Sequence, residues 1–155
     1  MTQNVKETMR KVGTIHKDKT FLEALTQMIE EKTNSLAVVG DQGELVGMIN
    51  TGRLIKEVVP DYLEEDAVAA HYANEDIFIE DVKKVKDSKV EKFMFSEPKA
   101  VSTKDSLMEV AAIAVSGKQL RVPVVDENKK PVGIITRTEL KRVFGEILDI
   151  EDKDN

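Results

Sequence analysis

The side chains best suited to contact a polar ligand lie together in the second half of the chain. Thr136 and Glu139 stand three residues apart and follow the apolar run Gly133-Ile134-Ile135. A hydroxyl at the start of a helix and a carboxylate are both groups that bind polar ligands. The same Thr-x-x-Glu spacing is also a capping box, in which the two side chains satisfy the backbone where a helix begins. On spacing alone the cap is favoured, and both interpretations remain open.

Two arginines stand beside these residues in the sequence. Arg121 directly precedes the apolar run V-P-V-V, and Arg137 follows Thr136. The planar guanidinium group donates in a fork that matches phosphate oxygens. Single arginines are usually solvated surface residues, so each is equally compatible with a phosphate contact and with an exposed charge.

The sequence offers no candidate for catalysis or for metal binding. The histidines, His16 and His71, have no second ligand three or four residues away, and the chain contains no cysteine. The motifs G-x-S-x-G, H-E-x-x-H and the P-loop do not occur. Paired carboxylates appear only in charge runs such as Glu64-Glu65-Asp66, which are typical of solvated surfaces. We therefore expect a protein that is not an enzyme and holds no metal.

The charge distribution bears on the class of partner. Of the 155 residues, 41% are hydrophobic and 34% charged, and the net charge of −6 arises within residues 59–88, which hold 3 Lys or Arg against 9 Asp or Glu. Because nucleic-acid surfaces need a basic stripe, no nucleic-acid partner is expected. No apolar run approaches the roughly 20 residues of a membrane span, and no apolar leader follows Met1. A cytoplasmic location without membrane association is expected.

The chain contains an internal repeat. A shift of 86 residues superimposes residues 15–58 on 101–144 without a gap, with eight identities in 44 positions. Apolar positions, turn signals and helix starts fall in phase as well, and residues 5–9 match 90–94 at a shift of 85. The chain is therefore interpreted as a tandem duplication.

Each repeat predicts the same order of elements. An extended piece at 14–15 or 100–101 leads to a capping box, Thr20-x-x-Glu23 or Ser106-x-x-Glu109, that begins an amphipathic helix. Two short apolar runs follow, 36–39 and 45–49 or 122–125 and 131–135, which predict paired strands before a closing helix. The fold class is therefore α/β (α+β), built from two β-α-β-β-α units.

The repeats define the predicted domain boundaries. Residues 1–59 form the first repeat, 60–88 an acidic helical linker, 89–148 the second repeat and 149–155 a frayed tail. Within the linker, helical patterns over 62–72 and 77–85 are separated at Asn74.

A doubled unit with V-x-x-x-M, the strand V-P-V-V-D and the sequence G-I-I-T-R-T-E-L resembles the CBS domain family. The pair looks like a freestanding Bateman module that covers almost the whole chain. The resemblance implies two repeats related by a pseudo-twofold axis, with two clefts that hold adenosine nucleotides or related molecules. It also implies a regulatory rather than a catalytic role.

The resemblance assigns roles to particular residues. The family's ribose-phosphate pattern is Gly, two hydrophobic residues, Thr or Ser, two further residues and Asp; here Gly133 begins it, Thr136 fits it and Glu139 replaces the Asp. With the resemblance, a nucleotide contact at Thr136 and Glu139 is favoured over a cap alone. Arg121 and Arg137 are then candidate phosphate contacts. Segments that correspond to the edges of the adenine are Lys99, Ala100, Val101, Val122 and Pro123.

The first repeat departs further from the family pattern. Asn50 occupies the position of the Thr, and Arg53 occupies that of the carboxylate. Asn50 can still cap a helix. Arg53 cannot accept hydrogen bonds from ribose hydroxyls, so it is a phosphate contact or, more consistently with its type, a surface charge. We therefore expect one competent cleft, in which the second repeat supplies the ribose contact.

Two functions follow from these observations. The first is a sensor that binds an adenine nucleotide, such as AMP, ADP or ATP, or a related adenosyl molecule, and signals to an unidentified regulated protein through a conformational change. The alternative is a ligand-free scaffold that forms a homodimer. A homodimer is favoured in either case if the apolar residues of the closing helix are exposed together: Val143, Phe144, Ile147 and Leu148.

Overall fold

The computed structural model describes residues 4–59, 68 and 74–151. The chain divides into two compact units. Unit 1 contains residues 1–12, 42–45 and 97–155, and unit 2 contains residues 13–41 and 46–96. The compact units and the sequence repeats therefore divide the chain differently, because the segment that leads into each repeat belongs to the unit built mainly from the other.

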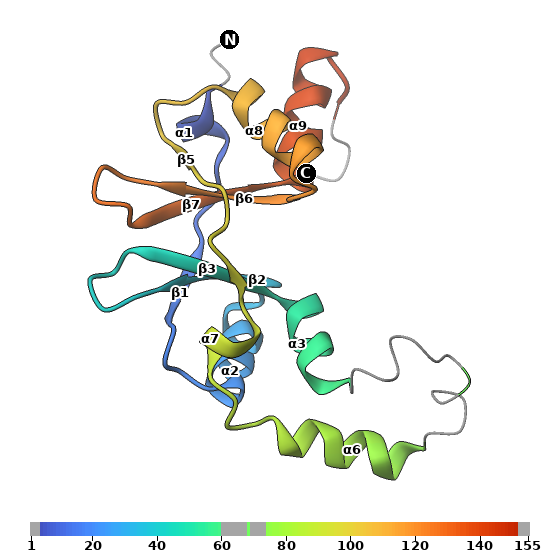
Figure 1. Ribbon diagram of the computed structural model, residues 1–155. Helices are drawn as coiled ribbons and strands as arrows, with labels where there is room; N and C mark the ends of the chain where they lie inside the picture. The colour runs from blue at the N-terminus through green and yellow to red at the C-terminus, as the bar shows by residue number, and fades with distance from the viewer. Residues whose placement is uncertain (1–3, 60–67, 69–73, 152–155) are drawn as a thin grey trace. The chain divides into compact units, whose positions relative to one another are not determined.

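Unit 2 is built on a four-stranded sheet, of which only Leu45 belongs to unit 1. The strands follow the order β1 (Gly13–His16), β2 (Ser35–Val39), β3 (Leu45–Asn50) and β4 (Phe95–Ser96). Strands β1 and β2 are parallel, and β3 and β4 are antiparallel. Helices α2 (Phe21–Glu31), α3 (Thr51–Val58) and α7 (Val90–Phe93) lie on one face of this sheet, as Figure 1 shows. Helix α6 (Glu75–Lys84) follows and buries none of its residues.

Unit 1 repeats the pattern with a three-stranded sheet. Its strands are β5 (Val101–Ser102), β6 (Arg121–Val125) and β7 (Pro131–Thr136), in that order. Strand β5 is parallel to β6, and β6 is antiparallel to β7. Helices α1 (Val5–Thr8), α8 (Leu107–Ser116) and α9 (Arg137–Ile147) cover one face of the sheet (Figure 1). The mixed α/β fold class expected from the sequence is confirmed.

Helix starts follow the predicted caps. The Thr20 side chain accepts a hydrogen bond from the N–H of Glu23, and the Glu23 carboxylate accepts one from the N–H of Thr20, so the capping box of α2 is complete. Ser106 accepts from the N–H of Glu109 at the start of α8. Asn74, expected to separate two helical pieces, is the N-cap of α6. The helical pattern over 62–72 lies outside the described residues, except for Val68.

Each unit has its own apolar core, completed by the leading segment of the other repeat. Val90 is fully buried among the core residues of unit 2, and Val5 is fully buried in the core of unit 1. Arg10 forms an isolated antiparallel bridge with Ile134 of β7 at the edge of the unit 1 sheet. In unit 2, β4 pairs with β3 in the corresponding way. The V-x-x-x-M segments therefore anchor each unit from a distant part of the sequence.

Several apolar residues of the helices remain exposed. Along α2, Phe21 and Met28 are buried, but Leu22 and Ile29 are exposed. On the closing helix α9 the four apolar residues are not exposed together, because Val143 is only 3% exposed and packs inward. Three residues of this set do remain exposed: Phe144, Ile147 and Leu148.

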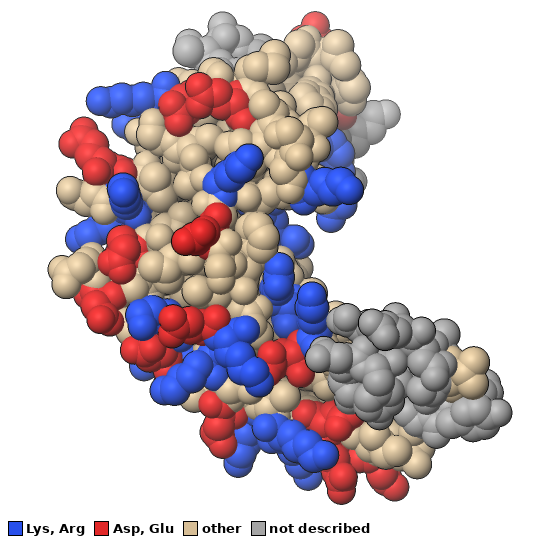
Figure 2. Space-filling model, in the orientation of Figure 1, with Lys and Arg blue, Asp and Glu red and all other residues tan. Residues whose placement is uncertain are grey.

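Charged side chains of both signs are interspersed over the face of the molecule seen in Figure 2. Among the described residues, no helix combines the length and the apolar character that a membrane crossing requires.

Candidate functional site

The second-repeat residues singled out from the sequence gather at one end of the unit 1 sheet. The register pairs Arg121 directly with Thr136 and Val122 with Ile135. Side chains alternate between the faces of a sheet, so Arg121 and Thr136 share the face opposite the core residue Val122. Ala100 lies just before β5, at the same end. The structure thus brings Arg121, Thr136 and the start of α9 into one neighbourhood.

Glu139 occupies a buried position at the start of α9. It is 3% exposed, and its Oε1 accepts hydrogen bonds of 2.8 Å from both the N–H and the hydroxyl of Thr136. The guanidinium Nε of Arg10 donates to the same oxygen at 3.3 Å. The capping box expected from the spacing is therefore complete. Among the described residues no hydrogen bond falls on Oε2, so half of this carboxylate remains able to accept.

Thr136 has only one hydroxyl proton, and it is directed at Glu139. The same hydroxyl oxygen accepts a hydrogen bond of 3.3 Å from the N–H of Thr138. An anionic ligand could receive the Thr136 proton only in place of the Glu139 carboxylate. Capping and phosphate contact therefore compete for this hydroxyl.

Gln119 joins the two segments that correspond to the edges of the adenine. Its side-chain Nε2 donates to the carbonyls of Lys99 at 2.7 Å and Arg121 at 3.1 Å. Its Oε1 accepts from the N–H of Lys99 at 3.0 Å. One amide thereby holds the backbone before β5 against the start of β6. The side chains of Val101 and Val122 face the core, which leaves only their backbone groups available to a ligand.

The remaining residues predicted in unit 1 are placed as follows. Arg137 is exposed at the first turn of α9. Gly133 is buried, and a Cβ added there would lie 2.6 Å from Met9 Sδ and 3.0 Å from the carbonyl oxygen of Arg10. Pro123 is fully buried in β6. Gly133 thus has a packing role, because its lack of a side chain lets the leading segment approach β7.

Asn50 and Arg53 belong to unit 2, whereas the second-repeat residues described above belong to unit 1. Asn50 caps α3 by accepting a hydrogen bond of 3.0 Å from the N–H of Arg53. The guanidinium carbon of Arg53 lies 5.3 Å from the centre of the Phe95 ring. This distance fits a cation-π contact. Arg53 is therefore a partly buried residue with an aromatic partner rather than a freely solvated charge.

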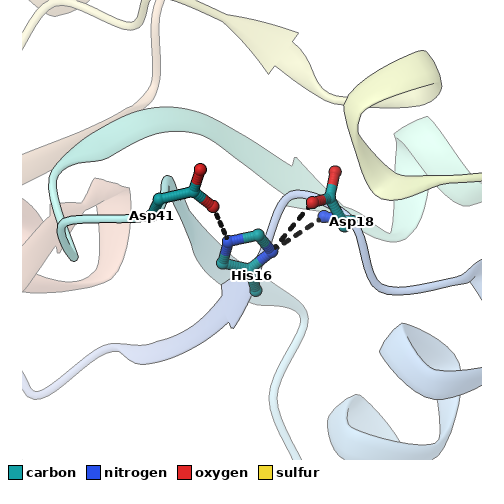
Figure 3. Close-up of side chains that lie close together, drawn as sticks. All are labelled: His16, Asp18 and Asp41. Atoms are coloured by element: carbon teal, nitrogen blue, oxygen red, sulfur yellow. Dashed lines mark hydrogen bonds and ion pairs between the residues drawn. The ribbon is translucent and has the colours of Figure 1, made fainter.

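A second polar cluster lies in unit 2, where His16, Asp18 and Asp41 offer three ligand atoms within 4.8 Å of one another (Figure 3). The Nε2 atom of His16 lies 2.8 Å from Asp41 Oδ1, and Nδ1 accepts from the N–H of Asp18 at 3.1 Å. Because Nδ1 accepts, the neutral ring carries its proton on Nε2 and donates it to Asp41. Both ring nitrogens thus have protein partners. Hydrogen bonding explains the arrangement without a metal ion.

The spacing of the histidines could not indicate this cluster. Asp41 is 25 residues from His16 in sequence and reaches it because β1 and β2 pair in parallel. Lys17 extends the cluster: its hydrogen bond with Asp18, aided by the charges of Asp18 and Glu91, raises its pKa above the usual value. The positively charged ammonium group of Lys17 lies beside Asp18, and its charge opposes the binding of a metal ion there.

At the start of α2, Glu23 has the same capping role as Glu139 in a solvent-exposed setting. The backbone N–H of Thr20 and then the Lys19 side chain lower the pKa of Glu23 below its usual value of 4.5. Glu23 is therefore ionised at neutral pH. It provides a natural reference for Glu139, because the two carboxylates share one local motif and differ in burial.

Two open hollows are lined by other described residues. One, of about 370 Å³, is in unit 2, between α2 and the start of α3. The other, of about 330 Å³, is in unit 1, where residues 102–104 meet 125–128. Neither is lined by a residue that the sequence predicted to bind a ligand.

Two residues of the candidate site were missed from the sequence. Gln119 carries no local signal, since its role depends on a contact 20 residues away. Arg10 could have been found through the internal repeat, which aligns it with Phe95 just as it aligns Glu139 with Arg53. In the structure Arg10 contacts Glu139, and their repeat equivalents Phe95 and Arg53 contact each other.

Comparison with known proteins supplies further findings. The family model described as "CBS domain" matches residues 4–60 and 90–146. Uncharacterized protein MJ1404 of Methanocaldococcus jannaschii is 28% identical over 143 residues, which cover 92% of this chain. The chain spans only 29% of the length of that relative.

Solved structures show the same fold. CBSX2 in complex with AMP aligns with a TM-score of 0.67 and 23% identity, over 95% of this chain and 99% of that one. CBSX2 comes from Arabidopsis thaliana. The CBS domain pair of protein MJ0100, in complex with 5′-methylthioadenosine and S-adenosyl-L-methionine, aligns with a TM-score of 0.69 and 24% identity, covering 95% of this chain and 99% of that one.

Proposed function

The chain belongs to the CBS domain family, and from this premise we propose that unit 1 binds the adenosine part of a nucleotide-type ligand. The observation that carries the proposal is Glu139, a buried carboxylate at a helix start with one oxygen unused among the described residues. An ionised carboxylate accepts hydrogen bonds on both oxygens, so Oε2 can accept one from a ribose hydroxyl while Oε1 keeps its contacts with Thr136 and Arg10.

Each residue of the neighbourhood has a role in this proposal. Oε2 of Glu139 accepts a hydrogen bond from a ribose hydroxyl. Arg121 and Arg137 meet the phosphate, and Thr136 joins them when its hydroxyl proton turns from Glu139 to the ligand. The backbone at Ala100, Val101, Val122 and Pro123 borders the adenine. At the aligned position in unit 2, Arg53 has no acceptor for a ribose hydroxyl.

Solved relatives support an adenosyl ligand. The complexes of CBSX2 and of the MJ0100 domain pair contain AMP in one case and 5′-methylthioadenosine with S-adenosyl-L-methionine in the other. These three molecules share adenosine and differ at the 5′ position. We infer that the chain is a non-catalytic regulatory module in which ligand binding changes the affinity for a protein partner.

The test is thermal unfolding of the full chain with AMP, ADP, ATP, 5′-methylthioadenosine, S-adenosylmethionine and NAD, one at a time. A ligand at about 100 times its dissociation constant stabilises the fold by about 2.7 kcal/mol. For a chain of this size the melting temperature then rises by about 5–10 °C. No rise with any member of the panel would overturn the proposal.

A matched pair of variants locates the site. Glu139→Gln keeps the size of the side chain and the acceptor for the cap but removes the charge, so adenosyl affinity falls by about 10–100-fold in calorimetric titration. Glu23→Gln makes the same change in the capping box of α2 and leaves the affinity unchanged. Equal affinities in both variants and the wild-type chain would move the ligand away from Glu139.

A second function, a homodimeric scaffold, is favoured by the apolar side chains on the last turns of α9. Phe144, Ile147 and Leu148 are 57%, 58% and 69% exposed. Their spacing places them on one side of the helix. We propose that this set, the α9 surface, contacts a second copy of the chain.

A further inference from the structure

The candidate site contains an arginine that the family pattern does not include. Arg10 comes from the leading segment of the first repeat, 129 residues from Glu139, and donates to Oε1 of that carboxylate. The hydrogen bonds between Arg10 and Ile134 in both directions, of 3.0 and 2.9 Å, fix its backbone beside β7. The position of Arg10 is therefore set by its pairing with the sheet.

Most of the hydrogen-bonding capacity of Arg10 is unused. Its side chain is 44% exposed, and Nε is its only group with a partner among the described residues. A guanidinium group has five N–H donors, so the four on the two Nη atoms remain available to a ligand. Oε1 of Glu139 is a common partner of Arg10 and the Thr136 hydroxyl. A group bound at Thr136 would consequently lie close to this guanidinium.

The charge of Glu139 is already balanced by Arg10. Two further guanidinium groups, those of Arg121 and Arg137, belong to residues that pair with or follow Thr136. The neighbourhood therefore has an excess of positive charge, which favours an anion and opposes a cation. In unit 2 the arginine is on the helix instead: Arg53 of α3 occupies the position aligned with Glu139 and contacts Phe95.

We propose that Arg10 is a specificity-determining residue that selects adenosyl ligands with a 5′-phosphate over neutral or cationic ones. It fixes Oε1 of Glu139 so that Oε2 meets the ribose, and its Nη groups donate to the phosphate. This inference rests on the proposed adenosyl function and adds the chemical class of the ligand.

The test compares three ligands that share adenosine: AMP, uncharged 5′-methylthioadenosine, and S-adenosylmethionine with its sulfonium group. In calorimetric titration the wild-type chain binds AMP most tightly. Arg10→Gln lowers the AMP affinity by about 10–100-fold and changes that for 5′-methylthioadenosine by less than about 3-fold. Arg10→Lys keeps the charge and restores part of the preference. Added salt weakens AMP binding more in the wild-type chain than in Arg10→Gln.

Arg142→Gln is the control. Arg142 Nη2 donates to the carbonyl of Thr8 at 3.1 Å, so it anchors the same leading segment without a contact to Glu139. Its loss can lower stability but leaves the ratio of AMP to 5′-methylthioadenosine affinity unchanged. An unchanged ratio in Arg10→Gln, or a wild-type preference for either ligand without phosphate, overturns this inference alone. Failure of all three ligands to bind the wild-type chain overturns this inference, and failure of the whole thermal-unfolding panel overturns the proposed function with it.

Discussion

At Gly133 a single hydrogen atom is all that the packing admits. A methyl group there would approach Met9 Sδ and the carbonyl oxygen of Arg10, at 2.6 and 3.0 Å. The methionine can move, whereas the Arg10 carbonyl is held by its hydrogen bond from the N–H of Ile134. We expect Gly133→Ala to lower the free energy of unfolding by about 1–3 kcal/mol in urea denaturation.

Gly145 provides the matched control, since it lies within α9 and an added Cβ would meet only Ile150, at 4.0 Å. Replacing a helical glycine by alanine reduces the conformational freedom of the unfolded chain. Gly145→Ala should therefore raise the free energy of unfolding by about 0.5–1 kcal/mol. If Gly133→Ala were as stable as the wild-type chain, the close approach of the leading segment to β7 would be wrong.

The chemistry of Glu139 could be predicted from the sequence only in part. Thr136-x-x-Glu139 predicted a helix cap, and the capping box is present. The ribose contact stays a prediction. The ion pair with Arg10 was not foreseen, because local spacing says nothing about a residue 129 positions away. The same holds for Asp41, which reaches His16 only through strand pairing.

At the scale of elements, the strands and caps followed from the sequence more fully than the helix faces did. The runs at 122–125 and 131–135 became β6 and β7, each with one residue added at an end. These runs are short, rich in β-branched residues and bounded by turns, so local preference and tertiary packing agree. The faces of α2 and α8 were harder to predict, because several apolar residues on them, Leu22, Ile29, Met108 and Val115, are exposed.

The short helices α1 and α7 show what local sequence cannot specify. Their V-x-x-x-M pattern indicates that a valine will be buried, but both cores offer a suitable place for it. The choice depends on which strand edge the following residues reach. In the structure Arg10 pairs with Ile134, and Ser96 pairs with Gly47, so each segment packs in the unit formed mainly by the other repeat.

Because the leading segments are exchanged, two similar substitutions should destabilise different units. Val5→Ala and Val90→Ala each remove two buried carbon atoms and should cost about 2 kcal/mol. In native-state hydrogen exchange, Val5→Ala should reduce the protection of β6 and β7, and Val90→Ala that of β2 and β3. The two variants serve as controls for each other. If Val5→Ala weakened β2 instead, the sequence repeats would be the packing units.

At the scale of the whole molecule, the duplicated architecture followed from the sequence, because the two copies support one another as evidence. The differences between the copies required the structure. Arg53 with Phe95 and Glu139 with Arg10 occupy aligned positions, yet one pair is aromatic and the other ionic. Two units that share a fold therefore differ in the side-chain contacts at these positions.

The α9 surface leads to a prediction about assembly. Light scattering should give about twice the mass of 17.4 kDa for the wild-type chain. The double variant Phe144→Glu with Ile147→Glu should lower the measured mass toward that of one chain, because the dimer contact would bury the introduced charges. Phe78→Glu, a similarly exposed apolar site on α6, should leave the mass unchanged. A measured mass of 17.4 kDa for the wild-type protein would argue against the scaffold function.

The exchange of leading segments also determines when the fold can be completed during synthesis. Residues 4–12 leave the ribosome well before their packing partners in β6, β7 and α9 are made. Unit 2 has all its strands and its core once residue 96 has emerged. Helix α1 of unit 1, in contrast, has no core to pack against until residues 97–147 have been made. Contacts over such separations form slowly and leave apolar surface uncovered meanwhile. The nascent chain is consequently exposed to chaperones and proteases at Val5 and Met9, which pack against the unit 1 core only once it has formed.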